Sequence, residues 1–136
     1  MQIINHEQQA REDWRPGVST RMRVSALTGS ANLTIFEQWA KPGLGAPPHR
    51  HAVEEVITVL DGQAEISLNG ESSVLKAGQS VVIPAGGLHG FRNSGDKVLH
   101  IQFTLAAPTF EAVYGNSGTR TQRWAPAGDQ QAPARD

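Results

Sequence analysis

Three histidines and a glutamate occur at close spacing in two separate stretches of the sequence. His49, His51 and Glu55 lie within residues 43–62, and His89 lies within residues 78–93. Side chains of an extended strand repeat every second residue, so His49 and His51 are expected on one face, roughly 6.6 Å apart along the chain. Glu55 keeps the same parity if the strand continues, and His89 must then come from a neighbouring strand. The four side chains are therefore predicted to form a metal site.

Three neutral imidazoles and one carboxylate suit a divalent transition metal such as Fe, Mn, Ni, Cu or Zn. Four protein ligands on a six-coordinate ion would leave two positions for water, substrate or dioxygen, which metal-ion catalysis requires. Glu54 is an alternative carboxylate, although parity favours Glu55. An isolated histidine is more often a surface residue or a hydrogen-bonding residue, and we interpret His6 and His100 in this way.

The two stretches resemble the two sequence motifs of the cupin superfamily, G-x5-H-x-H-x3-E-x6-G and G-x5-P-x-G-x2-H-x3-N. All ten fixed letters are present, and the segment 63–77 separates the two motifs. The resemblance implies a small single-domain cupin with a jelly-roll β-barrel, also called a double-stranded β-helix, and the same four metal ligands. The matching residues are Gly43, His49, His51, Glu55 and Gly62 in the first motif and Gly78, Pro84, Gly86, His89 and Asn93 in the second.

The reaction is left open by this resemblance, because cupins include dioxygenases, decarboxylases, isomerases, lyases and ligand-binding modules. Our leading hypothesis is a metal-dependent dioxygenase or other oxidoreductase acting on a small molecule. His100 and Gln102 would support the site if their strand face points inward. The alternatives are an isomerase, lyase or cyclase with Glu37, Glu54 or His100 as general base, and a cupin that only binds a small ligand.

The rest of the sequence predicts an all-β barrel or sandwich, because short β-forming runs alternate with Gly and Pro turns. Asn69-Gly70 is a strong hairpin signal between two such runs. Pro47 and Pro48 cannot donate to a central ladder, so they are expected at the start of the strand that carries the histidines. No long helix is predicted, and residues 109–114 are expected to form at most one helical turn.

Three segments are predicted: an N-terminal arm at 1–18, a barrel domain at 19–118 and a C-terminal tail at 119–136, disordered from 126. The run 55–60 is apolar on both faces apart from Thr58, so its second face needs cover. A homodimer is expected to provide this cover. The alternative is that the first strands of the chain itself form the second layer, which predicts a stable monomer. Trp14 in the arm is expected to anchor the arm to the barrel, or to a partner subunit at or near the dimer interface.

Composition limits the partners. Twelve basic and 13 acidic residues give a net charge of −1 without clustering, which indicates neither a nucleic-acid partner nor a membrane surface. The chain has no cysteine, which excludes disulfides and thiolate ligands. The first eleven residues lack the apolar run of a signal peptide, so a cytoplasmic protein with a small-molecule substrate or ligand is expected.

Overall fold

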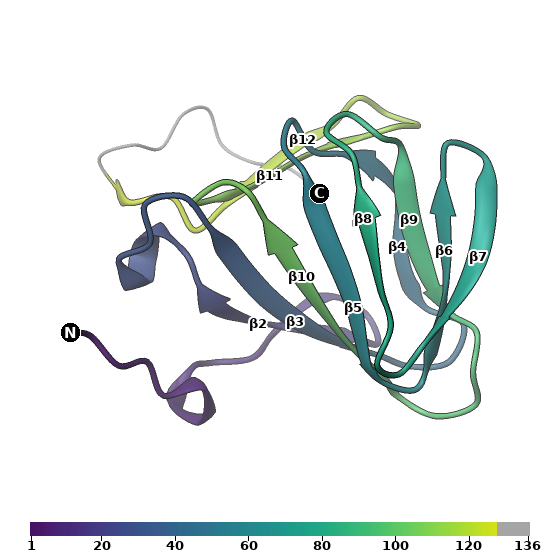
Figure 1. Cartoon of the computed structure of the whole chain (residues 1–136), viewed down its shortest axis with the longest axis horizontal. Coiled ribbons are helices and arrows are strands. Elements are labelled where there is room, and N and C mark those ends of the chain that lie inside the picture. Colours follow the sequence, from purple (N-terminus) through teal and green to yellow (C-terminus); the bar gives the residue numbers. More distant parts are fainter. Residues whose placement is uncertain (128–136) are drawn as a thin grey trace.

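Two antiparallel six-stranded sheets lie face to face in the computed structural model, which describes residues 1–127 (Figure 1). The first sheet has the order β1-β2-β3-β10-β5-β8 and the second has the order β12-β11-β4-β9-β6-β7. The strands of the first sheet are β1 (Glu12–Arg15), β2 (Val18–Val24), β3 (Thr34–Ala40), β10 (Leu99–Leu105), β5 (Glu55–Asp61) and β8 (Ser80–Ile83). Those of the second are β12 (Arg120–Arg123), β11 (Phe110–Tyr114), β4 (Gly45–Arg50), β9 (His89–Asn93), β6 (Gln63–Leu68) and β7 (Glu71–Lys76). This is the predicted all-β jelly roll.

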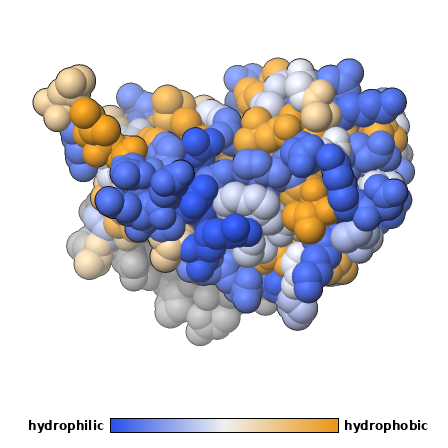
Figure 2. Space-filling view, turned by 90° about the horizontal axis from the view of Figure 1, so that it is seen from below, coloured by the Kyte–Doolittle hydropathy of each residue, from blue (hydrophilic) through white to orange (hydrophobic). Residues whose placement is uncertain are grey.

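Two short 3-10 helices, η1 (His6–Gln8) and η2 (Ala26–Thr28), are the only helical elements within residues 1–126. No helix in this part of the chain is long and apolar enough to cross a membrane. Seen from below, the surface is mainly hydrophilic with small separate apolar patches (Figure 2).

Strict alternation along the strands builds the core between the sheets. In β10 the odd-numbered residues from Leu99 to Leu105 are buried, whereas His100, Gln102 and Thr104 alternate with them and are only partly buried. In β5, Ile57 and Val59 face the core and are at most 1% exposed. On the other face of β5, Leu60 is 41% exposed, so this face is only partly covered within one chain.

The predicted hairpin is present between β6 and β7. Asn69 and Gly70 both have positive φ angles, 49° and 88°, which is the backbone that a two-residue hairpin turn of the primed type needs. The position of Pro47 and Pro48 differs from the expectation. Pro47 and Pro48 lie inside β4 rather than at its start, where the register of β4 against β9 shifts between Ala46 and His49. The irregular pairing explains how two prolines are accommodated within a strand.

The prediction of a helical turn at residues 109–114 is wrong. Residues Phe110–Tyr114 form β11, which pairs with β12 and with the end of β4. Phe110, Ala112 and Tyr114 are buried and alternate with exposed Glu111 and Val113. This period of two, which a short segment reveals only weakly, identifies a strand.

The sheets extend into both segments that were assigned to the ends of the chain. In the arm, β1 pairs with β2, and Trp14 packs against Phe36, Phe110 and Trp124 at ring-centroid distances of 5.7, 5.0 and 5.6 Å. The arm is therefore anchored to its own barrel, which was one of the two expected roles of Trp14. In the tail, β12 covers Arg120–Arg123, and most of the part expected to be disordered lies outside the described residues.

Candidate metal centre

The three histidines of the centre come from two paired strands of one sheet. His49 is the penultimate residue of β4, His51 follows directly after that strand, and His89 is the first residue of β9. The antiparallel register places His49 directly opposite His89. All three side chains are buried, between 2% and 8% exposed.

Glu55 reaches the same place from the opposite sheet. The strand of the histidines ends at Arg50, so the parity argument for Glu55 does not describe the structure. Glu55 is instead the first residue of β5, where it pairs with Leu105 and Ile83 on the core side and is 1% exposed. Glu54 is exposed, so the structure places Glu55 and not Glu54 among the histidines.

The histidine side chains are close enough to share one ion. Their ring centroids are 4.4 Å apart for His49–His89, 4.9 Å for His49–His51 and 5.2 Å for His51–His89. One ring nitrogen from each of the three lies within 4.8 Å of the others. These three histidines form a candidate metal site; the sequence predicted them as ligands together with Glu55.

Backbone carbonyls fix the orientation of each ring. The Nδ1 atom of His49 lies 2.8 Å from the Pro47 carbonyl oxygen, that of His51 lies 2.6 Å from the Glu111 oxygen, and that of His89 lies 2.9 Å from the Gly87 oxygen. A carbonyl only accepts, so each Nδ1 must carry the proton and donate it. In His49 and His51 the Nε2 atom can then hold a lone pair, which is the tautomer that a metal-binding histidine needs. Nε2 of His89 lies 2.8 Å from a Glu55 oxygen, to which it donates a proton that a metal would have to displace.

The Nε2 atom of His51 is buried without a hydrogen-bond partner. A buried polar atom without a partner costs about 1–3 kcal/mol, and such atoms call for an explanation. A bound cation would accept this lone pair and remove the cost. The donor set, three imidazole nitrogens and one carboxylate, also fits a divalent transition metal.

Glu55 bridges two of the histidines. Its Oε1 atom lies 2.8 Å from Nε2 of His89, and its Oε2 atom lies 3.5 Å from Nε2 of His51. The carboxylate therefore lies within reach of the Nε2 atoms of both His51 and His89. The carboxylate is as deeply buried as the rings that it contacts.

Burial keeps two of the rings neutral. Burial, together with the neighbouring His89 and His51, lowers the pKa of His49 to about 3. Burial also lowers the pKa of His51, against the opposing effect of the Glu55 charge. Burial acts in the same direction on His89, but the hydrogen bond and charge of Glu55 outweigh it and raise the pKa of His89.

The residues proposed to support the site lie elsewhere. His100 and Gln102 point away from the core, on the outer face of the first sheet, so the condition under which they would contribute is not met. Glu37 lies on the same outer face, where its carboxylate contacts His100 at 2.7 Å and Arg21 at 2.8 Å. With Glu54 exposed, none of the three candidate bases is at the metal centre.

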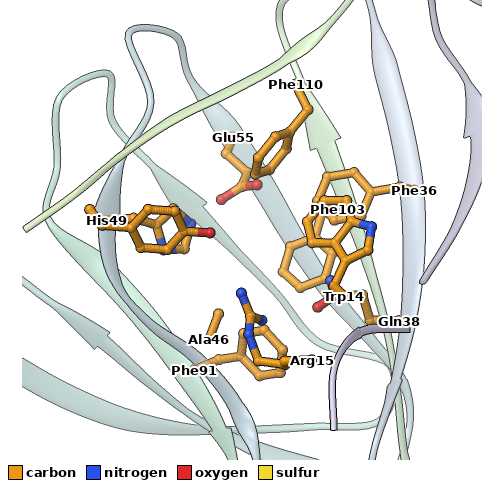
Figure 3. A pocket seen from close by; sticks show the side chains of 11 residues that line it. Trp14, Arg15, Phe36, Gln38, Ala46, His49, Glu55, Phe91, Phe103 and Phe110 are labelled. Atoms are coloured by element: carbon orange, nitrogen blue, oxygen red, sulfur yellow. The ribbon is translucent and has the colours of Figure 1, made fainter. Parts of the chain in front are cut away.

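A small pocket opens in front of His49 and Glu55 (Figure 3). Its walls are mainly aromatic, and Arg15, Gln38 and Tyr114 add polar groups. The aromatic residues other than Tyr114 are Trp14, Phe36, Phe91, Phe103 and Phe110.

Sequence reasoning missed most of this pocket. Phe91 shares its strand face with His89 and could have been found from parity, as could Phe36 and Gln38 from the alternation of β3. Arg15 and the carbonyl of Glu111 could not have been found in this way, because their positions depend on which strands lie beside the metal centre in the fold.

Comparisons with known proteins agree with this geometry. Residues 37–105 match the family model described as a cupin domain. Over 88 residues the chain is 35% identical to "Polyketide synthase CurC" of Streptomyces cyaneus, a match that covers 64% of this chain and 54% of that protein. The chain therefore spans about half the length of this relative.

Solved structures share the fold at low identity. The polyketide cyclase RemF from Streptomyces resistomycificus superposes with a TM-score of 0.69 at 22% identity, covering 87% of this chain and 89% of that one. A sugar phosphate isomerase of Silicibacter pomeroyi gives 0.72 at 18% identity, with 90% and 87% covered. An oxalate oxidase in complex with glycolate gives 0.71 at 21% identity, with 82% and 62% covered. At these identities the likeness shows the fold alone.

Proposed function

Because this chain belongs to the cupin domain family, we propose that it is a metal-dependent enzyme whose ion is held by His49, His51, Glu55 and His89 and binds an oxygen of a small organic substrate. The preferred reaction is oxidation by dioxygen. A bound Fe, Mn, Ni, Cu or Zn ion would supply Lewis acidity, and a redox-active one would also activate dioxygen.

One observation carries the proposal. Three buried imidazoles donate through Nδ1 to backbone carbonyls, so their three Nε2 atoms gather around one buried carboxylate beside an aromatic pocket that His49 and Glu55 line. A purely structural histidine cluster would use both ring nitrogens in hydrogen bonds, whereas Nε2 of His51 has no hydrogen-bond partner.

The location of the titratable groups favours chemistry centred on the ion. Glu37, Glu54 and His100, the candidates for an independent general base, lie outside the pocket. The aromatic walls would pack against the apolar part of a substrate, and the reacting oxygen would bind next to the histidines. A reaction that needs no separate base, such as oxidation of an enol or phenol, fits this arrangement best.

Cyclisation or isomerisation is the second candidate, and a specific observation favours it. The relative with 35% identity is named a polyketide synthase, and a polyketide cyclase shares the fold over 87% of this chain. In such a reaction the ion polarises a carbonyl without changing its oxidation state.

We expect the Fe(II)-loaded protein to consume oxygen when it is given a panel of small enols and phenols, because Fe(II) is redox-active and aromatic side chains line the pocket. The measurement is oxygen uptake with an electrode, together with product analysis. The Zn(II)-loaded protein is the control, since zinc has no redox chemistry.

Two other outcomes would contradict the preferred reaction. Turnover of a ketone or polyketide mimic without oxygen and with Zn(II) would instead support cyclisation or isomerisation. Ligand binding without turnover under either metal would assign the chain to the non-catalytic cupins.

We also propose that the chain forms a homodimer through the outer face of the first sheet. Leu60 and Val82 on this face are 41% and 55% exposed, and Val56 beside them is only half-buried. A two-fold interface between identical sheets would cover them. Because Trp14 packs inside its own barrel, the proposal rests on the sheet and not on the arm.

Light scattering is expected to give about twice the chain mass of 14.6 kDa at micromolar concentration. Leu60→Asp combined with Val82→Asp should shift the protein towards the monomer, because charges would be buried without partners. Val74→Asp, at an exposed apolar position of the other sheet, is the matched control and should leave the mass unchanged. A monomeric wild type would refute the dimer.

A further inference from the structure

A guanidinium enters the pocket in front of the histidines without an acidic partner. Arg15 is half-buried at the end of β1, and its Nη1 atom donates to the Gly45 carbonyl at 3.1 Å. Among residues 1–127 no carboxylate forms an ion pair with it, whereas Arg21 and Arg23 share Glu37. The positive charge of Arg15 is therefore available to a ligand.

The backbone directs this side chain into the pocket. Trp14 and Arg15 are consecutive, and in a regular strand they would point to opposite faces. Both nevertheless line the pocket, because the pairing of β1 with β2 shifts register between Asp13 and Arg15. Such an irregularity re-aims a side chain and often lies beside an active site.

The surroundings of Arg15 define what it could bind. Figure 3 shows its guanidinium directed into the space between His49, Glu55 and the ring of Trp14. The walls of this space are mainly aromatic side chains, so a planar or aromatic group of a ligand would pack against them.

One further polar group faces the same space. Gln38 is 2% exposed and donates through Nε2 to Oγ1 of Thr20 at 3.0 Å. This bond fixes the amide, and its oxygen is directed towards the pocket (Figure 3). It can accept a hydrogen bond from a substrate hydroxyl, whereas Arg15 can only donate.

We propose that Arg15 anchors an anionic oxygen of the substrate, and that the substrate is a small planar or aromatic carboxylate or phenolate. Arginine presents a planar fork of donors that matches a carboxylate, and charge-assisted hydrogen bonds are stronger than neutral ones. The inference rests on the proposed function for the placement of the reacting group beside the histidines. The anion contact itself does not require the metal.

The test measures anion binding and metal content separately on the full-length chain. The probes are 4-fluorobenzoate, pentafluorophenolate and the neutral 4-fluorobenzamide, each titrated by fluorine NMR into metal-free and metal-loaded protein. Arg15→Gln should weaken binding of at least one of the two anions about tenfold or more, and should leave the amide unchanged. The anion that responds identifies the class as carboxylate or phenolate.

Two variants control for charge and fold. Arg15→Lys keeps the charge and should retain part of the anion affinity, although it loses the planar fork. Arg11→Gln removes a cation that stacks on Trp39 outside the pocket, and should leave anion binding unchanged. Circular dichroism and the melting temperature verify that all three variants fold.

The outcomes separate this inference from the proposed function. Equal anion affinity in wild type and Arg15→Gln, or no anion binding by wild type at all, would overturn the anchor role while metal content remains a separate result. Anion binding that depends on Arg15 in a protein that takes up no metal would support the anchor role and refute the metal-dependent function.

Discussion

Replacement of His89 by alanine is expected to remove the metal from this protein. The His89 ring is 2% exposed, its Nδ1 atom is held by the Gly87 carbonyl, and its Nε2 atom faces Glu55. Loss of even an outer partner of a metal ligand costs about 10–100-fold in affinity, so loss of a ligand should cost more than about a hundredfold. Elemental analysis of protein purified without chelator, followed by titration with Fe, Mn, Ni or Zn, measures this.

His6→Ala provides the matched control. His6 lies in η1 and its ring contacts Gln9 at 2.7 Å, so its removal should leave the metal content of the protein unchanged. His49→Gln is a second test with a smaller change in volume, in case His89→Ala fails to fold. Wild-type protein that neither retains nor takes up any of the four metals would contradict the metal site.

The fold and the three-histidine cluster could be predicted because local sequence signals determine them. Gly43, Gly62, Gly78 and Gly86 have φ angles of 83°, 90°, 86° and 79°, a region that only glycine enters at low cost. Asn93 is also structural, since its Nδ2 atom donates to the carbonyls of Ala40 and Lys97. Five of the ten motif residues, the four glycines and Asn93, therefore fix turns and hydrogen bonds between backbone segments, which explains how a short pattern identifies a barrel.

The pocket could not be predicted because it depends on contacts between strands that are distant in the sequence. Arg15 reaches the site only through an irregular register, and Glu55 does so by crossing to the other sheet rather than by strand parity. The same limit explains why the sequence did not decide whether His100 and Gln102 face the pocket. Alternation predicts that they share a face, but which face points inward is decided by the pairing of β10 with β3 and β5.

Metal-dependent stability is the second large effect that we expect. The ligands come from both sheets, so they exist as a set only in the folded chain and the ion binds the folded state selectively. Metal at about 100 times its dissociation constant should add about 2.7 kcal/mol to the free energy of unfolding. Melting curves with metal and with chelator at pH 7.5 give this difference.

Acid should reduce the contribution of the metal to the free energy of unfolding. The direction of each histidine's pKa shift gives the sign of its own effect on stability. Histidine must be neutral to bind a metal, and the reference pKa is about 6.5. In the metal-free protein Glu55 raises the pKa of His89, so His89 gives stability below pH 6.5 that is lost as the pH rises through its folded value. The lowered pKa of His49, about 3, acts oppositely: it removes stability as the pH falls from 6.5 towards 3. The ion must displace the proton from His89, so its stabilising effect should be smaller at pH 5 than at pH 7.5. Equal melting temperatures with metal and with chelator at both pH values would contradict the linkage. Glu55→Gln removes the charge that favours the proton on His89. In a Glu55→Gln variant that binds the ion, the loss of metal stabilisation should therefore occur at lower pH.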